Sequence, residues 1–232
     1  MPALRIFETD PDAKPKPRPK YDNEVDFQFR SGRMVGNKPQ SLAHWRVTAA
    51  EPEVADAIAQ LMGGSPAEWD TSKDDALEVL TNTSRVQVVI DGPQAIKSTL
   101  ILWGRNGPIH ECDGAYSLLD EDRGEPCGCP RLMADRKALA RSGRGPAPNT
   151  TVRFRLAEDY DLGVGKFVST SWNLVEVLHE VEDELSDIEG EALCELSLEL
   201  VQFTNAAGQN VEYRKPVITV LKAWSDAIAE EV

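Results

Sequence analysis

The sequence lacks the features that mark several classes of protein. No stretch approaches the roughly 18 consecutive apolar residues of a membrane helix. The first residues, MPALRIFETD, show no basic region followed by an apolar core, so no secretory signal is expected. The 232 residues include only 4 cysteines, and a chain of this length can bury a core without disulfides. We therefore expect a soluble cytoplasmic protein, without membrane contact, whose cysteines are free thiols or metal ligands.

Bases are also scarce relative to acids. The chain has 25 Lys and Arg against 39 Asp and Glu, which gives a formal net charge of −14 at pH 7. Binding to a nucleic-acid backbone depends on clustered cations that release counterions, so little direct DNA binding is expected. An acidic body suits contact with a basic protein instead.

One short segment reverses this charge. In residues 11–20, PDAKPKPRPK, proline alternates with the cations Lys14, Lys16, Arg18 and Lys20. Because proline excludes a regular helix, residues 1–22 are predicted to form an extended N-terminal arm. The arm is either a plain linker or a docking segment whose cations contact phosphates or an acidic partner surface.

The rest of the chain, residues 23–232, is predicted to form a single α+β body. Alternating apolar residues predict strands, as in ALCELSLEL and VEYRKPVITV on either side of the turn NAAGQN. Strands outnumber helices without a regular βαβ order, which favours a mainly antiparallel sheet with a few packing helices and a small zinc-binding loop. An alternative division has two lobes, 23–108 and 150–232, linked by the zinc loop and a basic connector over 109–149.

Two amphipathic helices are predicted in this body. One covers PEVADAIAQLMGG, where the two glycines provide a stop. The other begins near Trp172, behind a cap at Ser171 or Asn173. The segment RKALARSGRGPAPN, which is rich in glycine, proline and small residues, is interpreted as an exposed connection.

Metal-ligand residue types gather in the stretch IHECDGAYSLLDEDRGEPCGCP, residues 109–130. It contains two close pairs separated by fourteen residues, namely His110-x-Cys112 and Cys127-x-Cys129. Zinc prefers a tetrahedral set of thiolate and imidazole, and two such pairs can close around one ion. The spacing within each pair is tighter than the usual two to four residues. The prediction is a structural zinc site, with an unliganded cysteine cluster and a redox pair as alternatives.

The sequence shows no convincing catalytic set. A catalytic zinc keeps one coordination position open for water, whereas four protein ligands leave none. The neighbouring acids Asp113, Asp120, Glu121 and Asp122 are interpreted as solubilising charges of a loop. No cofactor other than zinc and no small-molecule substrate is expected.

Three further residues carry expectations about packing. Cys194 lies on the apolar side of an alternating strand and is expected in the core, and His44 is also expected to pack. Trp69 lies in the polar passage SPAEWDTSKDD and is the tryptophan expected to be exposed, where it can anchor a protein interface. Local packing under a lid is the alternative for Trp69.

Several segments together resemble a known family. RIFETD, YDNEVDFQFRSG, WRVTAAEPEVADAIAQLMGG, LILWG with PIHECDG, SWNLVEVL and YRKPVITV are similar, in order and spacing, to segments of the recombination directionality factors of actinobacterial temperate phages. The similarity covers roughly residues 5–220, and no single segment is diagnostic.

The resemblance implies a regulatory protein and not an enzyme. Such a factor binds a large serine integrase on attachment-site DNA, switches it to attL × attR excision and inhibits attP × attB integration, while the integrase serine performs the chemistry. Two alternatives from other classes stay open. One is a metal-dependent hydrolase or nuclease with an open coordination position. The other is a single-strand DNA-binding accessory protein of phage DNA metabolism, which would use the basic arm and exposed aromatics.

Overall fold

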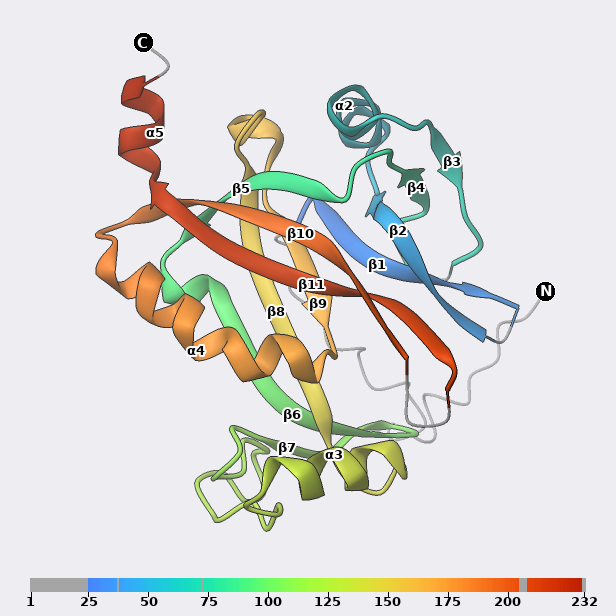
Figure 1. Ribbon diagram of the computed structural model, residues 1–232, viewed down its shortest axis with the longest axis vertical. Helices are drawn as coiled ribbons and strands as arrows, with labels where there is room; N and C mark the ends of the chain where they lie inside the picture. Colours follow the sequence, from blue (N-terminus) through green and yellow to red (C-terminus); the bar gives the residue numbers. More distant parts are fainter. Residues whose placement is uncertain (1–24, 37, 72, 205–207, 231–232) are drawn as a thin grey trace, which may run out of the picture.

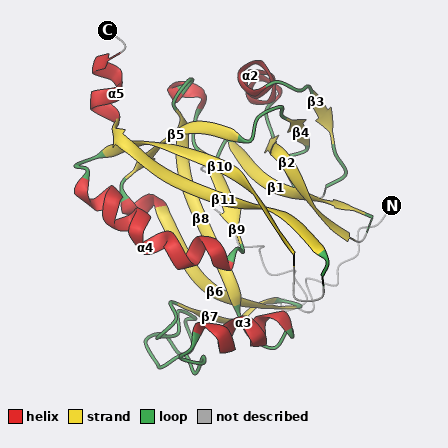
Figure 2. Ribbon diagram, in the orientation of Figure 1, coloured by secondary structure: helices red, strands yellow, loops and turns green. Residues whose placement is uncertain are grey.

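The computed structural model describes residues 25–36, 38–71, 73–204 and 208–230, and it has the predicted α+β fold with a mainly antiparallel sheet (Figures 1 and 2). The strands are β1 (Phe27–Val35), β2 (Lys38–Ala49), β3 (Pro66–Glu68), β4 (Leu77–Leu80), β5 (Arg85–Asp91), β6 (Ile96–Gly104), β7 (Gly107–Cys112), β8 (Ala147–Leu156), β9 (Gly165–Ser169), β10 (Glu191–Thr204) and β11 (Asn210–Ala223). The helices are α2 (Pro52–Met62), α3 (Met133–Arg141), α4 (Trp172–Asp187) and α5 (Trp224–Glu230), with short 3-10 turns η2 (Pro93–Ala95) and η3 (Tyr160–Leu162).

The described strands form one strongly bent sheet. Its order is β11-β10-β5-β8-β9-β1-β2-β4-β3, and β6 and β7 branch from β8. Every pair is antiparallel except β1 with β9. Strand β8 pairs with β6 and β9 through residues 147–154, and then with β5 through Arg155 and Leu156. Strands that precede and follow residues 113–146 therefore belong to one sheet.

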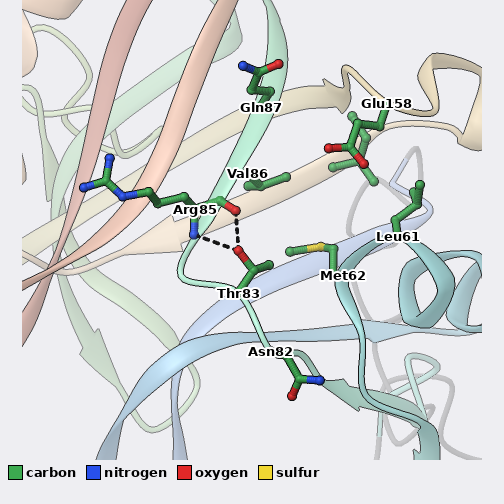
Figure 3. A pocket seen from close by; sticks show the side chains of 9 residues that line it. Leu61, Met62, Asn82, Thr83, Arg85, Val86, Gln87 and Glu158 are labelled. Atoms are coloured by element: carbon green, nitrogen blue, oxygen red, sulfur yellow. Dashed lines mark hydrogen bonds between the residues drawn. The ribbon is translucent and has the colours of Figure 1, made fainter.

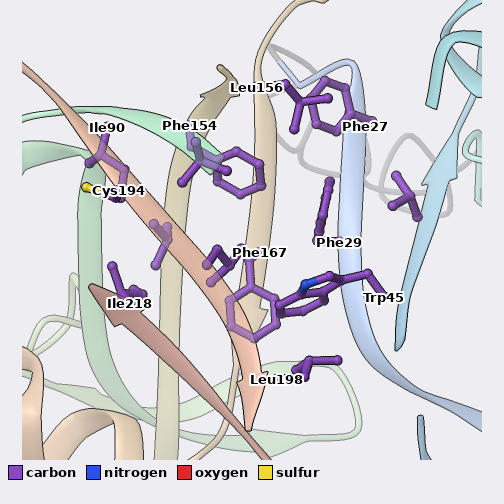
Figure 4. Packing of buried hydrophobic residues seen from close by; sticks show 14 of the residues in the cluster. Phe27, Phe29, Trp45, Ile90, Phe154, Leu156, Phe167, Cys194, Leu198 and Ile218 are labelled. Carbon is purple, nitrogen blue, oxygen red and sulfur yellow. The ribbon is translucent and has the colours of Figure 1, made fainter. Parts of the chain in front are cut away.

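An aromatic cluster fills the space inside the bend. Phe29 meets Trp45 and Phe154 edge-on at centroid distances of 5.5 and 5.3 Å, and Trp45 meets Phe167 at 5.2 Å. Leu198 on β10 lies against this cluster, because the β10–β11 hairpin crosses in front of β8 and β9 (Figures 1 and 4). Such T-shaped pairs contribute about 0.5–1.5 kcal/mol each beyond the burial of their apolar area.

Two helices cover the margins of the core as the sequence predicts. Ser171 caps α4, where its Oγ accepts the N–H of Leu174 at 3.4 Å. Leu174, Leu178, Val181 and Leu185 of α4 are buried in the core, whereas Val177 is exposed and the acidic residues lie on the other faces. Helix α2 ends before Gly64, where an added Cβ would meet the carbonyl oxygen of Leu80 at 2.2 Å, so no larger residue fits. Among the described residues, no helix has the length and apolar character needed to cross a membrane.

The structure corrects one prediction about a connecting segment. RKALARSGRGPAPN was interpreted as an exposed connection, but α3 extends to Arg141 and β8 already begins at Ala147. The run MADRKALAR consists mostly of strong helix formers, and the Gly and Pro residues that suggested a loop lie beyond its end. Along β8, Val152, Phe154 and Leu156 alternate with partly exposed residues and point into the core.

Candidate metal centre

Four metal-ligand side chains meet at the end of β7. His110 and Cys112 lie on this strand, whereas Cys127 and Cys129 come from the loop over residues 113–132. One ligand atom from each of the four lies within 4.8 Å of the other three. The structure therefore brings together all four residues that the sequence predicts as metal ligands.

The distances within the cluster fit a tetrahedral zinc ion. Cys112 Sγ lies 3.8 Å from Cys129 Sγ, and Cys129 Sγ lies 3.3 Å from His110 Nε2. Zn–S bonds of about 2.3 Å and Zn–N bonds of about 2.0–2.1 Å place two sulfurs about 3.8 Å apart and a sulfur and a nitrogen about 3.5 Å apart. The geometry and the donor set are both compatible with zinc, held by three thiolates and one imidazole.

The loop between the two ligand pairs is held by backbone hydrogen bonds. Ser117 forms an isolated antiparallel bridge with Cys112, and Tyr116 forms one with Pro126. The N–H of Cys127 donates to the carbonyl oxygen of Ala115 at 2.9 Å. The second cysteine pair therefore returns to β7 along a paired, strand-like path.

Two of the four nearby acids have roles in building this loop. Asp113 Oδ1 accepts the N–H groups of Ala115 and Tyr116 at 2.8 and 2.7 Å, and these bonds lower the pKa of its carboxyl. Asp122 Oδ1 accepts the hydroxyl of the buried Ser117 at 2.5 Å. Asp120 and Glu121 are exposed, as expected for solubilising charges. Among the described residues, the metal-ligand cluster consists of His and Cys alone.

The environment shifts the pKa values of the three thiols in different directions. Burial raises the pKa of Cys112 to about 12 and also raises the pKa of Cys129. Burial acts in the same direction on Cys127, but the N–H of Cys129 and the neighbouring thiols outweigh it and lower the pKa of Cys127. A divalent cation supplies the positive charge that three adjacent thiolates need.

Arg136 on α3 is a residue of this centre that the sequence analysis missed. Its guanidinium donates to the carbonyl oxygen of Pro130 at 2.5 Å and to that of Gly114 at 2.7 Å. These carbonyls adjoin the two cysteine-bearing segments, so Arg136 ties them together. A single arginine in a basic helix gives no sequence signal for this role.

Among the described residues, Cys194, His44 and Trp69 are not part of the metal cluster. Lys14, Lys16, Arg18 and Lys20 fall outside the described residues. Cys194 is fully buried, as predicted, but His44 is exposed instead of packed.

Trp69 is half-buried, and an arginine side chain packs over its ring. Its Nε1–H donates to the carbonyl oxygen of Asp75 at 2.6 Å, and the Arg46 guanidinium lies 4.3 Å from its ring centroid. This is the packed arrangement that the sequence analysis gave as the alternative to exposure. The exposed tryptophan is Trp103, with 56% of its surface accessible.

A small pocket lies beside α2, and Glu158 is the one carboxylate among its lining residues (Figure 3). Its volume is about 150 Å³, below the roughly 300–1,000 Å³ of small-molecule sites. The Thr83 hydroxyl donates to the carbonyl oxygen of Arg85 at 2.6 Å, so it is engaged by the backbone. The residues that line the pocket are Leu61, Met62, Asn82, Thr83, Arg85, Val86, Gln87, Leu156 and Glu158.

Comparison with known proteins assigns the chain to a family. A family model described as recombination directionality factor-like (Gp3-like) matches residues 13–222. The chain belongs to this family. No solved structure matches the chain. The match confirms the resemblance seen in the sequence, and it indicates a regulatory role in recombination for this directionality factor-like protein.

Proposed function

We propose that this chain binds a large serine integrase on attachment-site DNA, switches it to attL × attR excision and inhibits attP × attB integration. The observation that carries the proposal is the family match over residues 13–222. The net charge of −14 also supports it, because such a body favours a basic protein over a bare phosphate backbone. In this proposal the chain acts in the bacterial cytoplasm.

The proposed action is a shift between two arrangements of the integrase. A regulator changes such an equilibrium only by binding one arrangement more tightly than the other. Moving it from 1:99 to 99:1 requires about a 10⁴-fold difference in affinity, or about 5.5 kcal/mol. The integrase serine performs strand cleavage, and the directionality factor supplies binding free energy.

We assign the cluster of His110, Cys112, Cys127 and Cys129 to a structural zinc ion. Four protein ligands at these distances fill a tetrahedral shell, so no position is left for a reacting water. This argues against the alternative of a metal-dependent hydrolase. The zinc would hold the loop over residues 113–132 to β7.

The direct test is recombination in vitro. The purified chain is added to the integrase encoded by the same genetic element, with either attL and attR DNA or attP and attB DNA. We expect excision product only when the chain is present, and loss of integration product at the same chain concentration. Unchanged yields in both reactions would reject the proposed function.

A further inference from the structure

The tip of the β6–β7 hairpin exposes apolar side chains on both of its faces. Trp103 and Ile109 are 56% and 65% exposed, and Trp103 is the cross-strand partner of Pro108, which is also exposed. Ile109 lies across Gly104, where an added Cβ would meet its Cγ2 atom at 2.5 Å. We call Trp103, Pro108 and Ile109 the apolar tip.

The apolar tip is fixed in place by the structure around it. Strand β6 pairs with β8 from Ile96 to Ile101, and its tip pairs with β7 as far as Gly104. His110 directly follows Ile109 and belongs to the metal cluster, so a bound ion would hold the base of the tip to the loop over residues 113–132. An ordered surface loses little conformational entropy on binding, which suits a docking element.

The charge around the apolar tip favours a basic partner. Residues 103–129 contain six acids against two arginines, and the Asp120 side chain is 95% exposed. The β1–β2 hairpin also has exposed apolar residues, but residues 27–50 contain four Arg and Lys and no acid. Of these two hairpins, the β6–β7 hairpin is the one whose charge complements a positively charged DNA-binding protein.

We propose that the apolar tip inserts into an apolar depression on the integrase, with the acidic loop over residues 113–125 facing integrase cations. This inference rests on the proposed function and adds the surface through which it acts. Tryptophan in a well-packed pocket is a typical anchor of a protein interface. The acidic loop steers the encounter and excludes DNA from the same surface.

The test compares tip variants with a matched control in binding to the purified integrase. Trp103→Ser and Ile109→Ser each remove an exposed apolar side chain, and Ile228→Ser does the same on α5, at the opposite end of the molecule (Figure 1). We expect about tenfold or greater loss of affinity for each tip variant. Ile228→Ser should bind as the unaltered chain does, and zinc content should be equal in all four proteins.

A second variant keeps the test valid if a tip variant does not fold. Asp120→Lys combined with Glu121→Lys leaves the apolar tip intact and changes only exposed side chains. It should weaken binding, and raising the salt concentration should weaken its binding less than that of the unaltered chain.

The possible outcomes distinguish an error in the proposed binding surface from an error in the proposed function. If the unaltered chain forms no complex with the integrase, both the proposed function and the choice of partner are overturned. If the unaltered chain binds and the folded tip and charge variants bind equally well, the surface alone is wrong.

Discussion

Cys112 Sγ and Cys129 Sγ lie 3.8 Å apart although seventeen positions separate the two residues in the chain. That distance equals one edge of a zinc–thiolate tetrahedron, about 3.8 Å. Burial raises the pKa values of both thiols. The fold therefore places these two soft ligands at the separation that a shared zinc ion requires.

We expect one zinc ion per chain, lost on substitution of a ligand. Cys127→Ser and Cys129→Ser should each abolish stoichiometric zinc and lower the free energy of unfolding by about 2 kcal/mol or more, or roughly 4–8 °C in Tm. Elemental analysis and thermal unfolding check this. Cys194→Ala is the control, because it should lower stability through its core position yet keep the zinc. Zinc-free protein after gentle purification would contradict the assignment.

Arg136 should act on the metal through the loop that it ties together. Arg136→Met removes the hydrogen bonds to the carbonyl oxygens of Pro130 and Gly114 and should lower zinc affinity about tenfold, the lower end of effects seen for residues around metal ligands. Competition with a zinc chelator measures this. Arg141→Met changes an exposed residue of the same helix and should leave the affinity unchanged.

Trp69 and Trp103 should differ sharply in their effects on stability. Trp69→Ala removes the stack with Arg46 and the hydrogen bond to Asp75, and should cost about 1–3 kcal/mol. Trp103→Ala removes a largely exposed ring and should change stability by about 0.5 kcal/mol or less. Urea denaturation of both variants measures the loss in free energy of unfolding. Equal losses would show that Trp69 does not have the packing role described above.

The Asp75 carboxylate should make stability depend on acidic pH. Its burial tends to raise its pKa, but the Thr48 hydroxyl and the Arg30 guanidinium, both at 2.6 Å, outweigh this and lower it below 3.8. A lowered pKa stabilises the fold above the unfolded value, and the contribution is lost as pH falls through the folded value.

Asp75→Asn should therefore cost about 1–2 kcal/mol at pH 7, and the difference from the unaltered chain should shrink below about pH 4. Urea denaturation at several pH values provides the measurement. A pH-independent difference would show that the charge of Asp75 is not the cause.

The sequence was sufficient to predict features that depend on residues close together in the chain. The metal ligands were predictable because each pair has its two residues one position apart, and both pairs lie within one short stretch. The strands of the core were predictable because Val152, Phe154 and Leu156 alternate with polar residues, and burial selects one face.

The sequence was insufficient to predict packing and strand pairing between residues that lie far apart in the chain. Trp69 is packed because the Arg46 guanidinium, from a strand 23 positions earlier in the chain, stacks on its ring, and the sequence around Arg46 gives no indication of this contact. The parallel pairing of Phe29 with Phe167 joins residues far apart in the chain, and no turn motif in the sequence predicts it. Such pairings depend on the shape of the whole core.

The position of β8 has a consequence for the order of folding. Among the described strands, β5 pairs with β8 and β10 alone, and one edge of β6 pairs with β8. During synthesis, the edges of β5 and β6 that pair with β8 have no partner until residues 147–156 have left the ribosome. The sheet therefore depends on contacts of long sequence separation, which fold slowly. A chain that ends before β8 would expose unpaired strands and should aggregate.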